Sequence, residues 1–220
     1  MNILFNDIIQ CSDAPWELKS PALSDVLSTN GEIEIKLDKP RKLNAVGLGN
    51  CDGNVVIKLY TKSDYFTETI NPVENGLYML PQILNDITLI KITAVKIGRF
   101  AAGYACNIPT AVMKEPSYKS TSEPRITLSG QVIPGRGGYN YKTLHLDSRY
   151  KITREIMAEI DAGYKYIGMG YPFFIDFEDE AYKLPFTKLY ATETKQLSMT
   201  FQSGVRRFLY SRSFEFEERF

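Results

Sequence analysis

Residues Glu32–Leu37 read EIEIKL, and this strict alternation of charged and apolar residues favours β-structure over helix. The three apolar side chains fall on one side of an extended backbone and the charged ones on the other, which is typical of a half-buried strand. Further strand-like segments of the first half are Leu43–Leu48, Val55–Tyr60, Ile87–Thr93 and Ala94–Phe100. Pro40 and Pro81 are expected to interrupt the series. Strands without an intervening helix predict an antiparallel jelly-roll β-sandwich in residues 1–112, with an N-terminal arm.

The chain changes character in residues 113–124, MKEPSYKSTSEP, which have few large apolar side chains and two prolines. We interpret this stretch as a linker. Residues 125–220 then predict a second, β-rich α+β domain with one amphipathic helix. Ile152, Ile156 and Ile160 recur at helical spacing within residues 149–162, and Gly163 is expected to end the helix.

The charge of the chain and its lack of long apolar stretches argue against two kinds of partner, nucleic acids and membranes. The 26 basic and 26 acidic residues balance, so we expect neither nucleic acid nor a membrane surface as a partner. No apolar stretch approaches the roughly 18 residues of a spanning helix, and no secretory signal is recognisable, which predicts a cytoplasmic place of synthesis. Three widely spaced cysteines predict buried free thiols, although Cys51 and Cys106 could be bridged.

Residues suited to catalysis or metal binding are scarce. His145 is the only histidine, and no nucleophile motif accompanies it. The run DFEDE, residues 176–180, offers oxygen atoms for calcium but lacks the spacing of an EF-hand loop, so we interpret it as a solvated turn. We therefore expect no enzyme activity, no cofactor and no metal.

Asn50-Cys51-Asp52-Gly53 separates two predicted strands and contains residues that tolerate turn conformations, so it predicts a hairpin turn. The alternative is a ligand site, because loops at the rim of a β-sandwich can bind sugars. Asn50, Asp52 and Trp16, the only tryptophan, are the candidate residues for such a glycan rim.

Two segments are candidates for contacts with other protein chains. The glycine-rich loop PGRGGYNY contains Arg136, Gly137, Gly138 and Tyr139 and could reach a neighbouring subunit, with phosphate binding as the alternative. In the terminal FEFEE, Phe214 and Phe216 share one face, so this strand could extend a neighbour's sheet. Burial of both rings within the chain's own sheet is the competing interpretation.

Two stretches, PRKLNAVGLGNCDGNVVIKLY (residues 40–60) and ITLIKITAVKIGRFAAGY (residues 87–104), resemble the galactose-binding-like jelly roll of structural proteins in tailed-bacteriophage virions. The C-terminal half is similar to some phage tail and baseplate components. The resemblance implies a non-enzymatic tail, baseplate or neck component that assembles in the host cytoplasm. Its partners would be copies of itself, arranged as a homo-oligomeric ring, and other virion proteins. A carbohydrate-binding module is the alternative, with a glycan as its partner, and an enzyme ranks last.

Overall fold

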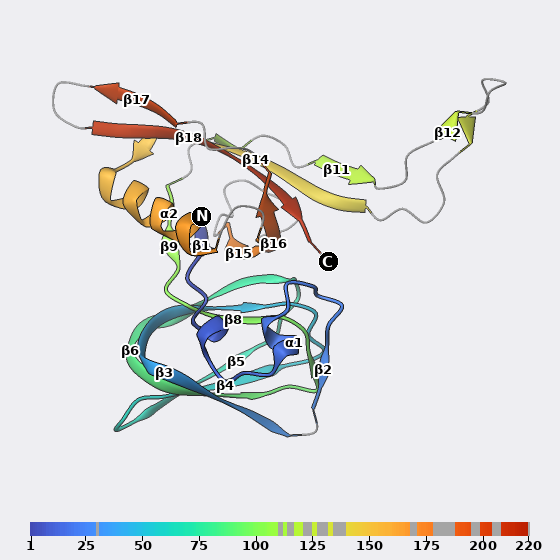
Figure 1. The fold of residues 1–220 in the computed structure, drawn as a ribbon, viewed down its shortest axis with the longest axis vertical. Helices are drawn as coiled ribbons and strands as arrows, with labels where there is room; N and C mark the ends of the chain where they lie inside the picture. Colours follow the sequence, from blue (N-terminus) through green and yellow to red (C-terminus); the bar gives the residue numbers. More distant parts are fainter. Residues whose placement is uncertain are drawn as a thin grey trace.

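The computed structural model describes residues 1–29, 31–109, 112–113, 117–120, 125–126, 132–133, 140–167, 171–177, 188–194, 199–203 and 208–219. Antiparallel sheets dominate these residues, and a β-sandwich-like layout is present, so the mainly β class is confirmed. Figure 1 shows two parts, one above the other. We call the lower part the N-terminal sandwich and the upper part, with its helix, the C-terminal sheet.

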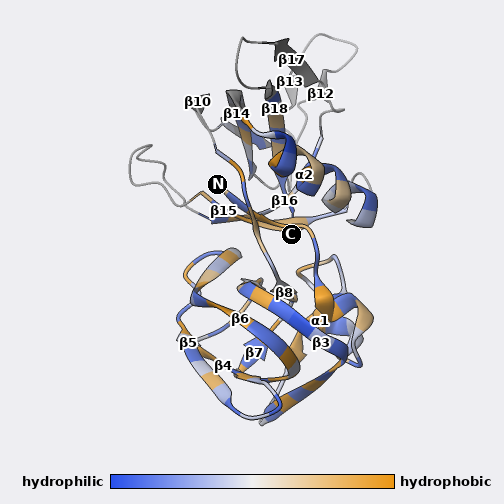
Figure 2. Ribbon diagram, turned by 90° about the vertical axis from the view of Figure 1, so that its left-hand side faces the viewer, coloured by the Kyte–Doolittle hydropathy of each residue, from blue (hydrophilic) through white to orange (hydrophobic). Residues whose placement is uncertain are grey.

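The N-terminal sandwich is built on a five-stranded sheet with the order β5-β4-β6-β3-β8. Its strands are β3 (Glu32–Leu48), β4 (Val55–Tyr60), β5 (Tyr65–Ile70), β6 (Gly76–Thr93) and β8 (Phe100–Gly103), and a small accessory sheet pairs β2 (Leu27–Ser28) with β7 (Lys96–Ile97). Polar and apolar residues alternate along the long strands (Figure 2).

The long strands β3 and β6 each run through a proline that was expected to break them. The breaks expected at Pro40 and Pro81 are therefore wrong. Their pairing is regular as far as Lys36 and again from Ala45, with register shifts between these residues, and both prolines are exposed in that irregular stretch. Proline is tolerated there because few ladder hydrogen bonds are lost where the strands bend. After the bend, each long strand contributes to a second layer, and the main apolar core fills the space between the layers.

The C-terminal sheet has nine strands, which come from both ends of the chain. Its order is β10-β14-β18-β16-β15-β1-β9, with β11 also pairing with β14 and β17 with β18. Its strands are β1 (Asn2–Leu4), β9 (Cys106–Asn107), β10 (Val112–Met113), β11 (Ser117–Ser120), β14 (Asn140–Ile152), β15 (Phe173–Asp176), β16 (Lys188–Glu193), β17 (Met199–Ser203) and β18 (Phe208–Glu218). A further pair, β12 (Arg125–Ile126) and β13 (Val132–Ile133), forms a separate hairpin.

This pairing differs from the division of the chain at residues 113–124. Strands β1 and β9, expected in the first domain, belong to the C-terminal sheet, where β1 lies between β15 and β9. Strands β10 and β11 overlap the expected linker and pair with β14, so those residues form part of the same sheet. The division between the two parts therefore does not coincide with any single point in the sequence.

One amphipathic helix packs on the C-terminal sheet, as expected, but it lies further along the chain than residues 149–162. Helix α2 spans Arg154–Ile167 and buries Met157, Ile160 and Tyr164. The expectation that Gly163 ends the helix is wrong, because this glycine lies inside it. A Cβ atom at Gly163 would overlap the ring of Phe5, so the glycine lets the N-terminal segment pack closely against the helix.

Candidate interaction site at the junction of the two parts

Small residues on the N-terminal sandwich allow the C-terminal sheet to approach closely. Ala45 and Ala101 are buried against Phe174 and Tyr190 in a separate apolar cluster. A Cβ atom at Gly47 would overlap the ring of Phe174. Apolar segments of β15 and β16 lie at the level where the two parts meet (Figure 2). The junction is therefore a packed core rather than a loose tether.

The N-terminal arm, residues 5–23, runs along this junction. It contains the short 3₁₀ helix η1 (Ile8–Cys11) and the four-residue helix α1 (Trp16–Lys19). Asp7 is the N-cap of η1, and its carboxylate accepts a hydrogen bond from the Ile9 amide at 3.0 Å. This cap satisfies an amide that the short helix leaves without a backbone partner.

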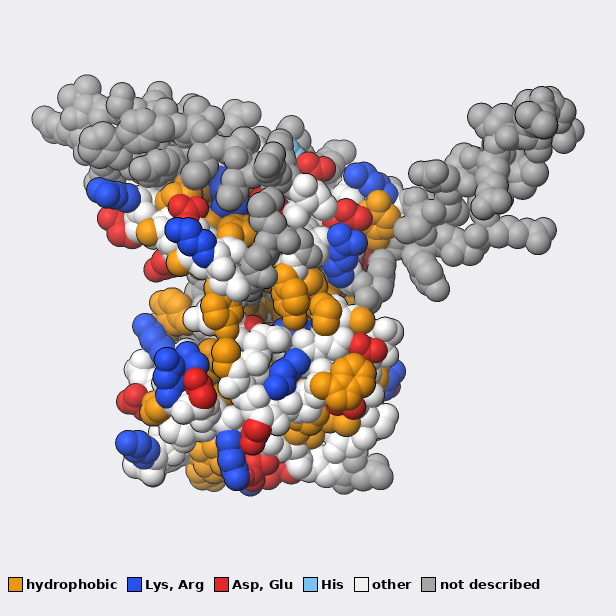
Figure 3. Space-filling model, in the orientation of Figure 1, with side chains coloured by type: hydrophobic (Ala, Val, Ile, Leu, Met, Phe, Trp, Pro, Cys, Tyr) orange, Lys and Arg blue, Asp and Glu red, His pale blue; other side chains and the backbone are white. Residues whose placement is uncertain are grey.

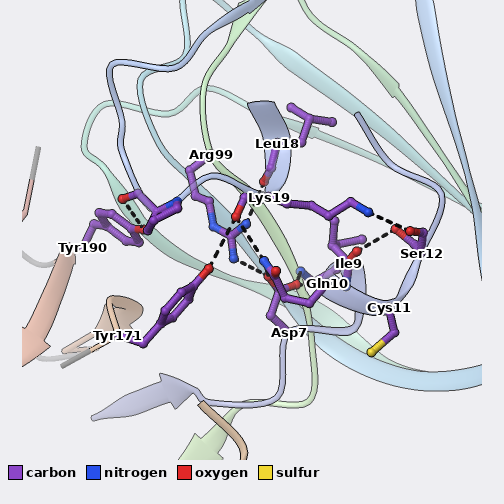
Figure 4. Close-up of polar contacts among 12 residues, drawn as sticks. Asp7, Ile9, Gln10, Cys11, Ser12, Leu18, Lys19, Arg99, Tyr171 and Tyr190 are labelled. Carbon is purple, nitrogen blue, oxygen red and sulfur yellow. Dashed lines mark hydrogen bonds and ion pairs between the residues drawn. The ribbon is translucent and has the colours of Figure 1, made fainter. Parts of the chain in front are cut away.

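A buried ion pair joins the arm to the sandwich (Figure 4). Arg99, which is 2% exposed, follows β7 and donates from Nη2 to the Asp7 carboxylate and from Nη1 to the Leu18 carbonyl at 2.8 Å. Asp7 also accepts from the Ala102 amide at 3.2 Å and from Gln10 Nε2 at 3.3 Å. The carboxylate is thus surrounded by donors, as a buried charge requires.

Three tyrosines from the C-terminal part donate hydrogen bonds to carbonyl groups of the same arm. Tyr190 Oη donates to Pro21 at 2.9 Å, Tyr171 Oη to Lys19 at 3.4 Å and Tyr166 Oη to Asp7 at 3.4 Å. Burial raises the pKa of the Tyr190 hydroxyl above its usual range. Desolvation and the adjacent Cys11 thiol raise the pKa of Tyr166 to about 12. Both hydroxyls therefore stay protonated near neutral pH and act as donors.

A cavity of about 240 Å³ lies beside the ion pair, between the arm and β15. We call it the junction cavity. Its polar lining consists of Asp7, Gln10 and Arg99, and its aromatic lining consists of Phe5, Tyr166, Tyr171, Phe173 and Phe174. Arg99 Nε is buried in its wall without a hydrogen-bond partner. Aromatic walls with a few fixed polar groups at a boundary between structural parts are typical of binding sites.

The side chains that line the junction cavity are mainly aromatic or apolar, and its one carboxylate is fully engaged. Its described lining residues include no histidine, cysteine, serine or lysine, and the Asp7 carboxylate is already engaged by four donors. Within the described ranges of the chain, no group of three or more His, Cys, Asp or Glu side chains could hold a metal ion.

The three residues of the expected glycan rim have different surroundings. Trp16, at the start of α1, is 65% exposed. Asn50 donates from its amide nitrogen to Asn75 Oδ1 and from Nδ2 to the Leu23 carbonyl, both at 2.7 Å. Asp52 lies 3.6 Å from Lys96 Nζ. Both polar members of the rim are therefore engaged by their own chain.

The connection that contains Asn50 turns sharply, with φ of 51° at Asn50 and 72° at Gly53, but it is not a hairpin. Strands β3 and β4 lie on opposite sides of β6 and do not pair with each other, so the expected hairpin is wrong. The left-handed backbone suits Asn and Gly, and it serves here to cross between non-adjacent strands.

The expected interface strand is internal to the molecule. Phe214 and Phe216 are both 0% exposed and pack in the core between the C-terminal sheet and α2. Strand β18 pairs with β14 on one side and with β16 and β17 on the other, so its backbone offers no open edge to a neighbour over these residues. The competing interpretation, burial in the chain's own sheet, is the correct one. Arg136, Gly137, Gly138 and Tyr139 lie outside the described residues.

The remaining residues that could take part in catalysis or metal binding lie in separate places in the structure. His145 lies on β14 opposite Glu215 of β18. Cys11, Cys51 and Cys106 are all free thiols, so the possible bridge between Cys51 and Cys106 is excluded. The expected burial is correct for Cys106 and wrong for Cys11, which is exposed, while Cys51 is half-buried. In the DFEDE run, Asp176 is buried and pairs with Lys188 at 2.9 Å, whereas residues 178–180 lie outside the described part of the chain.

Sequence reasoning missed Asp7 and Arg99 because they are far apart in the chain. Two signals were present in the sequence. Asp7 immediately precedes the apolar pair Ile8-Ile9, as an N-cap does, and Arg99 is a charge set between Gly98 and Phe100 in an otherwise apolar run. An unexpected charge in a buried run predicts a buried partner, but the sequence alone does not identify which one.

Comparisons with known proteins return no match, whether to family models, to curated proteins or to solved structures. No helix among the described residues is long and apolar enough to cross a membrane.

Proposed function

We propose that this chain is a non-enzymatic structural component of a phage virion, in the tail, baseplate or neck, and that it works through protein–protein contacts. The observation that carries the proposal is the pair of hairpins that project from the compact body. Strands β12 and β13 pair with each other and with no other described strand, and they lie far from the body in Figure 1. The β17–β18 hairpin extends on the opposite side.

A two-stranded hairpin on its own is at best marginally stable in water. An arm of this kind gains stability when it packs against a neighbouring chain, and its unpaired strand edges can extend a neighbour's sheet. Copies of the chain arranged in a ring, and other virion proteins next to that ring, would supply such neighbours. The virion is therefore the proposed location, reached by assembly in the host cytoplasm.

Sedimentation velocity over a wide concentration range, together with electron microscopy, tests this proposal. Replacement of residues 125–133 by a short Gly-Ser linker removes the β12–β13 hairpin and should abolish formation of the ring without changing the thermal unfolding of the body. Lys62→Gly with Ser63→Gly, in the exposed β4–β5 turn, is the matched control and should assemble normally. A chain that stays monomeric at every concentration and joins no complex with other virion proteins would contradict the proposal.

A glycan-binding module is the second candidate, and the exposed indole of Trp16 favours it. The engagement of Asn50 and Asp52 by their own chain weakens it. Isothermal titration calorimetry with a panel of monosaccharides distinguishes the two candidates, because it reads binding in the wild type and in a variant without tryptophan alike. Saturable binding to a strict monomer, lost in Trp16→Ala, would favour the glycan module.

A further inference from the structure

We propose that Trp16 of one copy of this chain inserts its indole ring into the junction cavity of a second copy. The inference rests on the proposed assembly function and names one contact by which copies associate. It accounts for two features that the single chain leaves unexplained, which are an exposed tryptophan and a cavity lined by aromatic side chains.

The first feature is the position of Trp16. Helix α1 exposes 65% of this residue, whereas Leu18 of the same helix is fully buried. Tryptophan is among the residues most enriched at the energetic centres of protein interfaces, because a large rigid ring buries much apolar area with little loss of conformational entropy. An exposed tryptophan on an anchored helix is therefore well placed to be buried in an interface with another protein chain.

The second feature is the size and chemistry of the junction cavity. Its volume of about 240 Å³ is below the roughly 300–1,000 Å³ of pockets that enclose drug-sized ligands, and it suits a single ring system. Aromatic rings surround the space, and the Arg99 guanidinium in its wall can lie against the face of an indole. Since Asp7 neutralises Arg99, an uncharged ring fits this site better than an anion.

Both features belong to one rigid segment. The carbonyls of Leu18 and Lys19, in the helix that carries Trp16, accept hydrogen bonds from Arg99 and Tyr171 of the cavity wall. Figure 3 shows exposed hydrophobic side chains gathered at the level where the two parts of the molecule meet. Because the indole ring and the cavity are close together on one molecule, two copies can exchange their indole rings reciprocally about a two-fold axis. The resulting dimer is the repeating unit of the proposed ring.

The intrinsic fluorescence of the full chain tests the contact directly, because Trp16 is its only tryptophan. Dilution across the dissociation constant should shift the emission from shorter to longer wavelength, in step with the fall in mass measured by light scattering. Trp16→Ala should weaken dimerisation roughly 30-fold or more, the loss expected for an interface hot spot. Tyr65→Ala is the control, because this 60% exposed aromatic lies outside both α1 and the cavity lining and should leave the dissociation constant unchanged.

Variants on the cavity side provide an independent measurement. Ala101→Leu narrows the cavity, and Tyr166→Ala removes part of its wall from the exposed side of α2. At least one of the two should keep the wild-type melting temperature and still weaken dimerisation. A mixture of Trp16→Ala, which has an intact cavity, with the cavity variant that keeps the wild-type melting temperature, which has an intact indole, should form heterodimers tighter than either homodimer.

The possible failures are distinguishable. Dimers with unchanged emission, or full assembly of Trp16→Ala, would overturn the Trp16 contact and leave the virion proposal intact. A monomer whose emission shifts only on adding a sugar or another small molecule would overturn the contact in favour of a ligand site. A chain that never assembles would overturn both proposals.

Discussion

The N-terminal sandwich and the C-terminal sheet are both antiparallel, but they are assembled from the chain in different ways. The strands of the sandwich come from one continuous stretch, residues 27–103, and its core follows local alternation of polar and apolar residues. The nine-stranded sheet instead combines β1 from the start of the chain with β18 from its end. The comparison shows that one class of sheet can arise from local or from distant pairing, and that only the local kind is visible in short sequence patterns.

The largest effect is expected from breaking a distant pairing. Ile3, which is 0% exposed, lies in β1 between β15 and β9, so Ile3→Asp places a carboxylate inside the C-terminal core. We expect a loss of about 4–5 kcal/mol in the free energy of unfolding. Hydrogen exchange should show lost protection in the C-terminal sheet while the sandwich stays protected. Val73→Asp, at an 88% exposed position, is the control. Equal loss of protection in both parts would mean that they unfold as one unit.

The junction ion pair is expected to have the next largest effect. Arg99→Met leaves the Asp7 carboxylate buried without its cation, which should cost about 3–5 kcal/mol in urea unfolding. The double variant Asp7→Asn with Arg99→Met should recover part of that loss, because no uncompensated charge remains. If the double variant is no more stable than the single one, the carboxylate does not depend on Arg99 for its charge balance.

Close packing between the two parts predicts a smaller loss. Gly47→Ala introduces a Cβ atom into the ring of Phe174 and should cost about 1–3 kcal/mol. Gly31→Ala is the matched control, since among the described residues no heavy atom outside its chain neighbours lies within 4 Å of the position its Cβ would occupy. Phe174→Leu added to Gly47→Ala should relieve the overlap. A Gly47→Ala variant with the wild-type melting temperature would show that the two parts adjust to each other easily.

The last effect is a pH dependence of stability, expected from a charged cluster inside the C-terminal part. Burial raises the pKa of the Glu193 carboxyl to about 7, while its ion pair with Arg212 at 2.9 Å acts in the opposite direction. Tyr164 also donates to this carboxyl, and the Arg212 guanidinium lies over the Tyr164 ring. The side chain of Arg212 is fully buried, so the cluster is shielded from solvent.

The sign of the pH dependence follows from this raised pKa. Between its ordinary value near 4.5 and about 7, the folded chain binds the Glu193 proton more tightly than the unfolded chain. The free energy of unfolding should therefore fall as pH rises through this window, and stay constant above it. Glu193→Gln should remove this change, as measured by thermal unfolding at several pH values. A wild-type stability that rises with pH in the same window would show that the ion pair outweighs burial.

Sequence reasoning found those elements whose pattern is local. The alternation at Ile33 and Ile35 correctly places both residues in the core, and the spacing of Ile152, Ile156 and Ile160 identifies the region of the helix although not its bounds. The bends of β3 and β6 were missed because prolines at exposed, irregular register positions look like strand ends. The junction was missed because Asp7, Arg99 and Tyr190 meet only through the tertiary fold.

The placement of β1 also has a consequence for the time course of folding. Ile3 pairs with Ile175, so the loop that this contact closes contains most of the chain. Closing so long a loop has a high entropic cost, and structures dominated by such contacts fold slowly. During synthesis the sandwich can form, and β1 can pair with β9, before β15, the other partner of β1, has left the ribosome. The junction can therefore form only after β15 and β16 have been synthesised, and a chain exposes it to a neighbour only from that point on.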